Sequence, residues 1–409
     1  MVIAMTGAPV VHKHTAKSLV RSHPAPTPLV PSKPYAAKES LRDAFVVTPI
    51  QDKGHGVVAV RDIALGERLL VDAPLTEFEG KWQDSQTSIK PPLADALAAL
   101  GPEGRRRFFA LSQDESRFGT EKTALGVFAT NGIPYLRGKV PCISIFATGA
   151  RFNHSCAPNA VYRWNTNLNA LTVHACQPIA AGDEICVYYG FDGHVTRSAR
   201  QTRLKSSFGF DCTCAKCRLS GRALRESEDR LAIIGNDGSA RRILEDWTGL
   251  MDLLNGEAPA VLARLESRFR LIKQECPDGH YPGLECFLLA FVQICDSAVA
   301  ALTDVLERWP RPFEEFSRAA VGLTVGEPGA KQLVHVSRFE VHSKLATYAD
   351  AARRWATLAR DVTRDVEGND SPAYHVWCEA AGDQGCWSHS SNSCRTFIQL
   401  WREAGLSIG

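Results

Sequence analysis

The sequence predicts an α+β protein with a strand-rich first half and a helical second half. Phe45–Ile50, Val57–Arg61 and Glu67–Pro74 are short segments rich in branched residues, as strands are. From Ala223 onward, apolar residues recur with helical periodicity, most clearly over Pro282–Arg308. With 409 residues, the chain is long enough for two domains.

Composition narrows the classes of protein to consider. The formal net charge is only +2, so the chain as a whole does not have the charge of a nucleic-acid binder. It has no apolar run of about 18 residues that could span a membrane, and no visible secretory signal. Its 13 cysteines are an odd number in a chain too large to need disulfides. They indicate reduced thiols and metal ligands in the nucleus or cytoplasm.

Residues 1–40 are basic and rich in proline, and they have no acidic residue before Glu39. Such a stretch cannot bury enough apolar surface to fold, so we predict that it is disordered. A mitochondrial presequence is the lesser alternative, since such segments are also basic and poor in acids. The prolines argue against the amphipathic helix that a presequence needs.

Two features lie between the predicted strands. Lys53-Gly54-His55-Gly56 separates the first two, and its glycines predict a tight turn whose backbone can closely approach a ligand. An ordinary hairpin turn is the alternative. A helical insert is predicted at about residues 90–130, over Leu93–Leu100, Arg105–Leu111 and Thr123–Ala129. Asn131-Gly132 follows it and is typical of a turn.

The second half is predicted to be all-helical and divided by Gly, Pro and Asn. Lys331–Glu367 is a second helical stretch, broken at a point that the sequence does not fix. Cysteines and histidines near the end are too widely spaced for a known metal motif. We interpret them as incidental thiols and imidazoles: His375, Cys378, Cys386, His389 and Cys394.

Three motifs in the middle of the chain contain the candidate catalytic and metal-binding residues. They run from Arg151 to Asn159, from Gly182 to Gly190 and from Phe208 to Cys217. The last one places Cys212, Cys214 and Cys217 in one tight loop. Structural zinc is held by four N or S ligands, so three thiolates require a fourth ligand from elsewhere. A thiol cluster without a metal is the alternative.

In this order and at this separation, the motifs resemble the core of the SET-domain protein-lysine methyltransferases, over about residues 45–217. The nearest branch is the SET-and-MYND-like or fungal SET-domain group without a MYND finger, since no cysteine precedes Cys142. The resemblance implies small β-sheets with a pseudoknot and a SET domain at 41–190. It also implies a post-SET zinc-binding segment at 191–220. Residues 221–409 are similar to a tetratricopeptide-like domain only in their helical periodicity, without a matching motif.

The resemblance also implies roles for individual residues. S-adenosylmethionine is the expected co-substrate and Tyr189 the catalytic residue, with Tyr188 as the register alternative. Tyr188 and Phe208 line the substrate channel. Cys156 joins Cys212, Cys214 and Cys217 around one structural zinc. The residues expected to contact the cofactor are Lys53, Gly54, His55, Gly56, Asn131, Asn153, His154, Tyr189 and Phe210.

The expected chemistry explains these residue types. A lysine has a pKa of about 10.4, so only about 1 in 2,000 is the neutral nucleophile at pH 7. A narrow apolar channel lowers that pKa by desolvation and aligns the amine with the methyl group. Aromatic walls suit a cationic target. Related enzymes often have a tyrosine where this chain has Phe208, which predicts room for more than one methyl group.

The predicted function is therefore methyl transfer to a lysine of a protein, a histone tail being one candidate. The alternative is a catalytically silent SET-domain scaffold that binds protein partners. A zinc-dependent nucleic-acid adaptor is a third hypothesis, but direct nucleic-acid binding is not expected. It would use basic residues that are predicted to lie on a solvated face: Arg197, Arg200, Arg203, Lys205, Lys216, Arg218 and Arg222. No membrane partner is expected.

Overall fold

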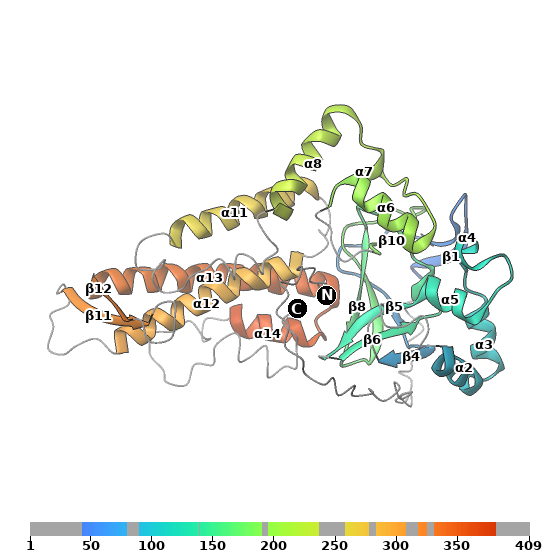
Figure 1. The fold of residues 1–409 in the computed structure, drawn as a ribbon, viewed down its shortest axis with the longest axis horizontal. Helices are drawn as coiled ribbons and strands as arrows, with labels where there is room; N and C mark the ends of the chain where they lie inside the picture. Colours follow the sequence, from blue (N-terminus) through green and yellow to red (C-terminus); the bar gives the residue numbers. More distant parts are fainter. Residues whose placement is uncertain are drawn as a thin grey trace, which may run out of the picture.

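The structure is a computed structural model, and it describes residues 43–79, 90–138, 140–189, 195–236, 258–277, 284–307, 318–324 and 331–381. The basic segment 1–40 lies outside these ranges, as do Cys386, His389 and Cys394. Figure 1 shows the strands of the first half gathered at one end of the molecule and the long helices of the second half at the other. Among the described residues, no helix is long and apolar enough to cross a bilayer.

The first two strands form a hairpin, β1 (Phe45–Ile50) with β2 (Gly54–Ala59). The turn lies at residues 51–53, where Asp52 has a φ of 60°. The tight turn predicted over Lys53–Gly56 is therefore displaced, since Gly54 and Gly56 already belong to β2. Aspartate tolerates the left-handed conformation, so the chain reverses before it reaches the glycines.

Two antiparallel three-stranded sheets form the body of the first half. One has the order β3-β9-β8 and the other β4-β6-β5. The predicted strand at Glu67–Pro74 is confirmed as β3. The bounds are β3 (Arg68–Asp72), β4 (Thr76–Glu79), β5 (Ile133–Arg137), β6 (Val140–Ile145), β8 (Ala160–Asn165) and β9 (Ala170–Ala175).

One parallel pair of short strands determines where the site lies. β7 (Asn153–His154) pairs with β10 (Cys186–Val187), so that Val187 is opposite His154. The residues just before β10 run along the edge of β2, with Ile185 N donating to Val57 O at 2.8 Å. This segment is thus held on two sides, and the tyrosines that follow it are brought beside the Asn153-His154 pair.

Each region of the first half has its own core. The sheet around β7 and β10 buries Val57, Leu69, Phe152, Val173 and Ile185. The predicted helices of the insert are confirmed as α2 (Lys90–Ala99), α3 (Pro102–Phe109), α4 (Glu115–Phe118) and α5 (Ala124–Asn131). Three of them, α2, α3 and α5, share a core with β4 and β6 that includes Phe78, Phe108 and Phe128. A short 3-10 helix, η3 (Gly149–Arg151), precedes β7.

The second half is mainly helical, as predicted, but it is not all-helical. The helix predicted at Pro282–Arg308 is confirmed as α12, yet an antiparallel hairpin of β11 and β12 precedes α13. The prediction of helix over Lys331–Glu367 is therefore wrong for its first seven residues. Valines at 334 and 336 favour a strand, and periodicity alone does not distinguish short apolar runs. The bounds are β11 (Arg318–Thr324) and β12 (Lys331–Ser337).

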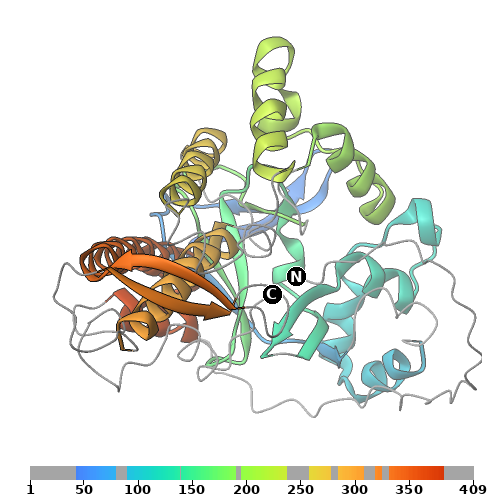
Figure 2. The same cartoon turned by 60° about the vertical axis from the view of Figure 1, so that its left-hand side comes forward.

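The helices after the second motif are α6 (Arg197–Phe208), α7 (Ala215–Arg218), α8 (Gly221–Asn236), α11 (Ala258–Glu275), α12 (Leu284–Glu307), α13 (Arg338–Glu367) and α14 (Pro372–Ala381). α12 and α13 lie side by side, and α14 packs on α13 (Figure 1). Their core includes Phe291 stacked on Trp355, with ring centroids 4.0 Å apart. In Figure 2, the green helices α6 to α8 and the yellow helix α11 lie along the upper edge of the molecule.

The end of α13 attaches the helical half to the first half. Arg68 on β3 forms a bidentate ion pair with Asp370, one of whose two bonds measures 3.0 Å. Arg68 Nε also donates to His174 Nε2 at 3.0 Å, and Asn165 Nδ2 donates to Asp370 Oδ1 at 3.2 Å. A side chain at Gly368 would collide with Arg68. This contact is polar and closely fitted.

Candidate active site

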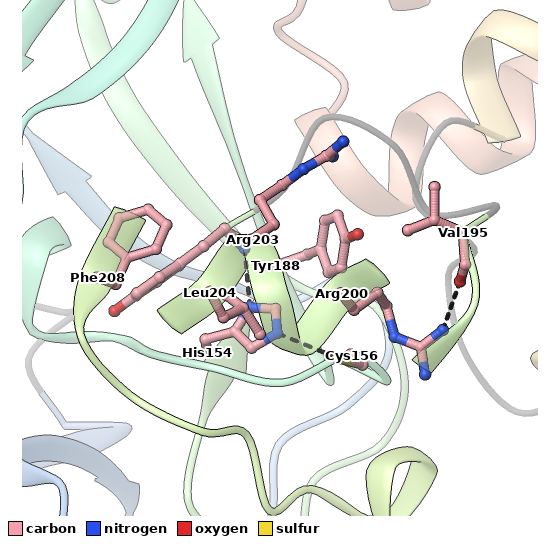
Figure 3. A pocket seen from close by; sticks show the side chains of 9 residues that line it. His154, Cys156, Tyr188, Val195, Arg200, Arg203, Leu204 and Phe208 are labelled. Carbon is pink, nitrogen blue, oxygen red and sulfur yellow. Dashed lines mark hydrogen bonds between the residues drawn. The ribbon is translucent and has the colours of Figure 1, made fainter. Parts of the chain in front are cut away.

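The three motifs meet at one place. Figure 3 shows a pocket in which His154 and Cys156 point toward each other, with Tyr188, Leu204 and Phe208 around them. Tyr189 lies against the third motif, its ring centroid 5.0 Å from that of Phe208. The pocket is lined by His154, Cys156, Tyr188, Tyr189, Val195, Arg200, Arg203, Leu204 and Phe208.

Tyr189 is fixed through both its backbone and its hydroxyl. Its amide N–H donates to His154 Nδ1 at 3.0 Å, and its hydroxyl donates to Phe152 O at 2.6 Å. Burial raises the pKa of Tyr189 well above its ordinary value of 10. The phenol is therefore a neutral donor at physiological pH. Tyr188, the register alternative, also lines the pocket, with its ring centroid 5.3 Å from that of His154.

His154 organises the site and is not placed as a general base. Because Nδ1 accepts from the Tyr189 amide, the proton of the neutral ring lies on Nε2. Nε2 lies 3.3 Å from Cys156 Sγ. Both nitrogens are thus engaged, and the side chain is only 6% exposed. The imidazole links the tyrosine backbone to the cysteine of the first motif.

Glu184 is a site residue that sequence reasoning missed. Its carboxylate accepts from Lys53 Nζ at 2.6 Å and from Asn153 Nδ2 at 2.9 Å. Burial alone lowers the pKa of Lys53, but the hydrogen bond and charge of Glu184 outweigh it and raise that pKa above 10.5. Glu184 lies in the second motif, two residues before β10 begins.

The two glycines of β2 have different surroundings. A Cβ at Gly56 would lie 2.7 Å from Asn153 Nδ2 and 3.0 Å from Glu184 Oε1, so only glycine fits there. A Cβ at Gly54, where φ is +74°, would meet nothing within 4 Å. His55 between them is exposed, and its carbonyl accepts from Asn153 Nδ2 at 3.3 Å. The backbone thus closely approaches Asn153 on one side and leaves open space on the other.

Asn131 is bonded within the helical insert. Its amide nitrogen donates to Ser112 O and Val127 O, both at 2.7 Å. Those bonds use both N–H protons and fix the end of α5 to the turn that follows α3. A role for Asn131 as a cofactor contact stays a prediction.

The cysteines come together as predicted. The four Sγ atoms of Cys156, Cys212, Cys214 and Cys217 lie within 4.8 Å of one another, and Cys156 is 3.5 Å from Cys217. Zinc–sulfur bonds of about 2.3 Å in a tetrahedron put neighbouring sulfurs roughly 3.8 Å apart. Hydrogen bonds from Cys156 and Cys212 lower the pKa of Cys217 to about 7. The donor set therefore fits a tetrahedral thiolate metal site.

The local sequence explains how the loop reaches Cys156. α6 ends at Phe208, and the left-handed φ of +78° at the next residue, Gly209, turns the chain so that Phe208 and Phe210 both lie near Tyr189. The side-chain amide of Gln201 then holds the Cys212 backbone, accepting from its N–H and donating to its C=O, both at 2.7 Å. The first cysteine of the loop is thus fixed against α6.

The basic residues around the loop are not all solvated, which corrects the prediction. Arg200 is 4% exposed and Lys216 is 7% exposed. Arg200 lies in the pocket wall beside Cys156 and donates to Val195 O at 2.7 Å (Figure 3). The spacing of charges along a helix did not reveal that one of them faces the cysteines. Arg203, Lys205, Arg218 and Arg222 are exposed.

Comparison with known proteins agrees with this geometry. Residues 54–190 match the family model of the SET domain. The chain is 30% identical over 187 residues to the histone-lysine N-methyltransferase set5 of Schizosaccharomyces pombe. This alignment covers 46% of this chain and 54% of set5. It is 39% identical over 74 residues to the protein-lysine N-methyltransferase SMYD4 of Mus musculus. That alignment covers 18% of this chain and 9% of SMYD4. The chain thus spans about half the length of the first of these relatives.

Proposed function

We propose that this protein transfers methyl groups from S-adenosylmethionine to lysine side chains of proteins. The observation that carries the proposal is the position of Tyr189. It follows β10, is held by His154 and Phe152, and lies against Phe208 and Phe210. The names of the relatives, histone-lysine and protein-lysine N-methyltransferase, support the same reaction.

The cofactor, when bound, supplies a methyl group on a sulfonium that a neutral amine can displace. The protein has to hold a lysine as that neutral amine and in line. The rings of Tyr189, Phe208 and Phe210 form a cluster that desolvates a lysine side chain, which lowers its pKa. The neutral phenol of Tyr189 orients the amine.

The residues around Glu184 are suited to hold the cofactor. Lys53 offers a cation for its carboxylate, and Asn153 and His154 offer polar atoms beside it. The open space next to Gly54 leaves access for a ligand along the hairpin. Phe210, 6.1 Å from His154 between ring centroids, offers a face for the adenine. The parallel pairing of β7 with β10 supports the pseudoknot expected of this fold.

The four cysteines hold one structural zinc. Cys156 belongs to the first motif and the other three to the loop, so one ion fastens the loop to the core. Phe208, which has no hydroxyl to restrict the space near Tyr189, permits more than one methyl addition. Histones, implied by the names of the relatives, are the first substrates to test, and the nucleus is the corresponding place of action.

The proposal is tested with radiolabelled S-adenosylmethionine, purified histones and a cell lysate. Wild-type protein is expected to label a protein band, and Tyr189→Phe to reduce the rate by at least about 100-fold. Tyr374→Phe, on α14 of the helical half, is the matched control and should stay within about threefold of wild type. Labelling lost in Tyr188→Phe but kept in Tyr189→Phe would move the role by one residue. A wild-type protein that binds the cofactor but labels nothing would favour the scaffold alternative.

A further inference from the structure

The cysteine loop is held from outside by a carboxylate of the helical half. Glu275, the last residue of α11, has a side chain that is only 3% exposed. It forms an ion pair with Lys216 Nζ at 2.9 Å and another with Arg230 at 3.0 Å, and it accepts from Ser227 Oγ at 2.6 Å. Three donors from α7 and α8 thus converge on one buried acid.

The positive charges around Glu275 keep its carboxylate ionised. Burial by itself raises the pKa of Glu275, but Lys216 and the hydrogen bonds of Ser227 and Arg230 outweigh burial and lower it. Glu275 is therefore ionised where it lies. A buried ion pair of this kind is strongly destabilising when only one partner is removed, since the other charge remains in the interior.

Lys216 gives the contact its significance, because it lies between Cys214 and Cys217. Its backbone is part of the loop that brings the thiols to Cys156, while its ammonium is held by α11. Arg197 on α6 also connects this loop to α8. Arg197 donates to Cys217 O at 3.3 Å and to Leu219 O at 2.9 Å, and its amide N–H donates to Glu228 of α8 at 3.2 Å.

We infer that Glu275 is a positioning residue for the cysteine loop, through which the helical half sets the closure of the active site. The loop is fastened to the SET core by the thiols and to the α8–α11 pair by Glu275. Phe208 and Phe210 lie just before the loop, so a shift of Lys216 moves the aromatic residues beside Tyr189. This inference rests on the proposed function for its effect on catalysis, but its structural part can be measured separately.

The test uses the full-length protein and the variant Glu275→Gln, which keeps the shape and removes the charge. Zinc release is followed with a colorimetric chelator, and steady-state kinetics give kcat and the KM for S-adenosylmethionine. Zinc release should become about tenfold faster, and the KM should rise about tenfold, since supporting residues of metal sites have effects of this size. The value of kcat should change less than about twofold, because Tyr189 is untouched.

Two further variants isolate the ion pair. Glu226→Gln removes an exposed acid that pairs with Arg222 on α8, and it should behave as wild type. Adding Lys216→Met to Glu275→Gln removes the stranded charge. Zinc release in the double variant should then return to within about twofold of that in Lys216→Met alone.

Hydrogen exchange separates this inference from the proposed function. Glu275→Gln should speed exchange of the amides from Cys212 to Cys217, whether or not the protein methylates anything. If loop exchange and zinc release match those of Glu226→Gln while only the melting temperature falls, Glu275 merely stabilises the helices and the inference is wrong. Wild-type protein that holds zinc but transfers no methyl group would instead contradict the proposed activity.

Discussion

Asn153 joins three parts of the candidate cofactor site through one side chain. Its amide donates to Glu184 and to the His55 carbonyl, and it lies where a Cβ on Gly56 would stand. Glu184 in turn holds Lys53. The two residues proposed to contact the cofactor are thus positioned by a common carboxylate.

Asn153→Ala should weaken binding of S-adenosylmethionine by about tenfold, because a hydrogen bond to a charged group contributes about 1.5–3 kcal/mol and part of this is regained from water. Isothermal titration calorimetry measures the change. Asn167→Ala is the matched control, since Asn167 is exposed and its side-chain amide donates to Asp370 O. Equal affinity in wild type and Asn153→Ala would show that the cofactor binds elsewhere.

The residues of the site could be predicted where a motif names the residue type. The four cysteines, His154 and the tyrosine pair were found in this way, and the structure brings them together. Glu184 and Glu275 could not be found, because a carboxylate that holds another side chain has no spacing of its own. Arg200 was assigned to a solvated face for the same reason. Its burial depends on the position of Cys156, which is far away in sequence.

At the scale of elements, the third motif, from Phe208 to Cys217, has little regular structure of its own. One short helix, α7, and the bonds of Gln201 and Arg197 fix its path. The thiols supply the remaining contacts with the core. Because metal binding by such a loop is coupled to its folding, the loop would depend on the proposed zinc.

Metal removal should therefore abolish methyl transfer while leaving most of the helical signal in far-UV circular dichroism. Cys156→Ser should retain less than one zinc per chain by atomic emission and lose activity, since one of four ligands is replaced. Cys142→Ser is the control, as this buried cysteine lies on β6, outside the cluster. Full activity in a verified metal-free preparation would contradict the role of the ion.

The elements themselves were predictable to differing degrees. The strands at β1 and β3, the helical insert and α12 follow directly from residue type and periodicity. The hairpin of β11 and β12 was missed because two strands that pair only with each other lack a distinctive pattern. The parallel contact of β7 with β10 involves two residues each, which is too short for any periodicity to reveal.

At the scale of the whole molecule, the contact around Arg68 and Asp370 joins the two halves and contains a buried histidine. His174 is 1% exposed, and burial, with the charge of Arg68 next, lowers its pKa from 6.5 to about 3. Sequence gave no sign of this contact, since its members come from β3, β8, β9 and the turn after α13. Gly368 and Asp370 had been noted only as punctuation between helices.

The pH dependence of stability should reflect His174. Its folded pKa lies below its unfolded pKa, so the unfolded chain binds a proton first as pH falls. Stability from this group is fully present above about pH 6.5 and is lost progressively toward pH 3, by up to about 1.4 kcal/mol per pH unit. Urea unfolding at pH 7.5, 6.5, 5.5 and 4.5 measures the slope.

His174→Asn should show a shallower slope over this range than wild type, although it is less stable at pH 7.5. His375→Asn is the control, since this histidine is an exposed residue of α14. Parallel slopes for wild type and His174→Asn would mean that the carboxylates alone set the acid sensitivity.

The parallel pairing of β7 with β10 has a consequence for synthesis on the ribosome. Asn153 emerges well before its partner strand, and the loop that ends at Cys217 and the acid at Glu275 emerge later still. At about 5–20 residues per second, translation from Tyr189 to Glu275 takes on the order of ten seconds. During that interval the nascent chain displays the first motif without the residues that close over it. If the protein has the proposed activity, the growing polypeptide would therefore not modify the lysines of the translation machinery around it until the SET domain is complete and the helical half has begun to appear.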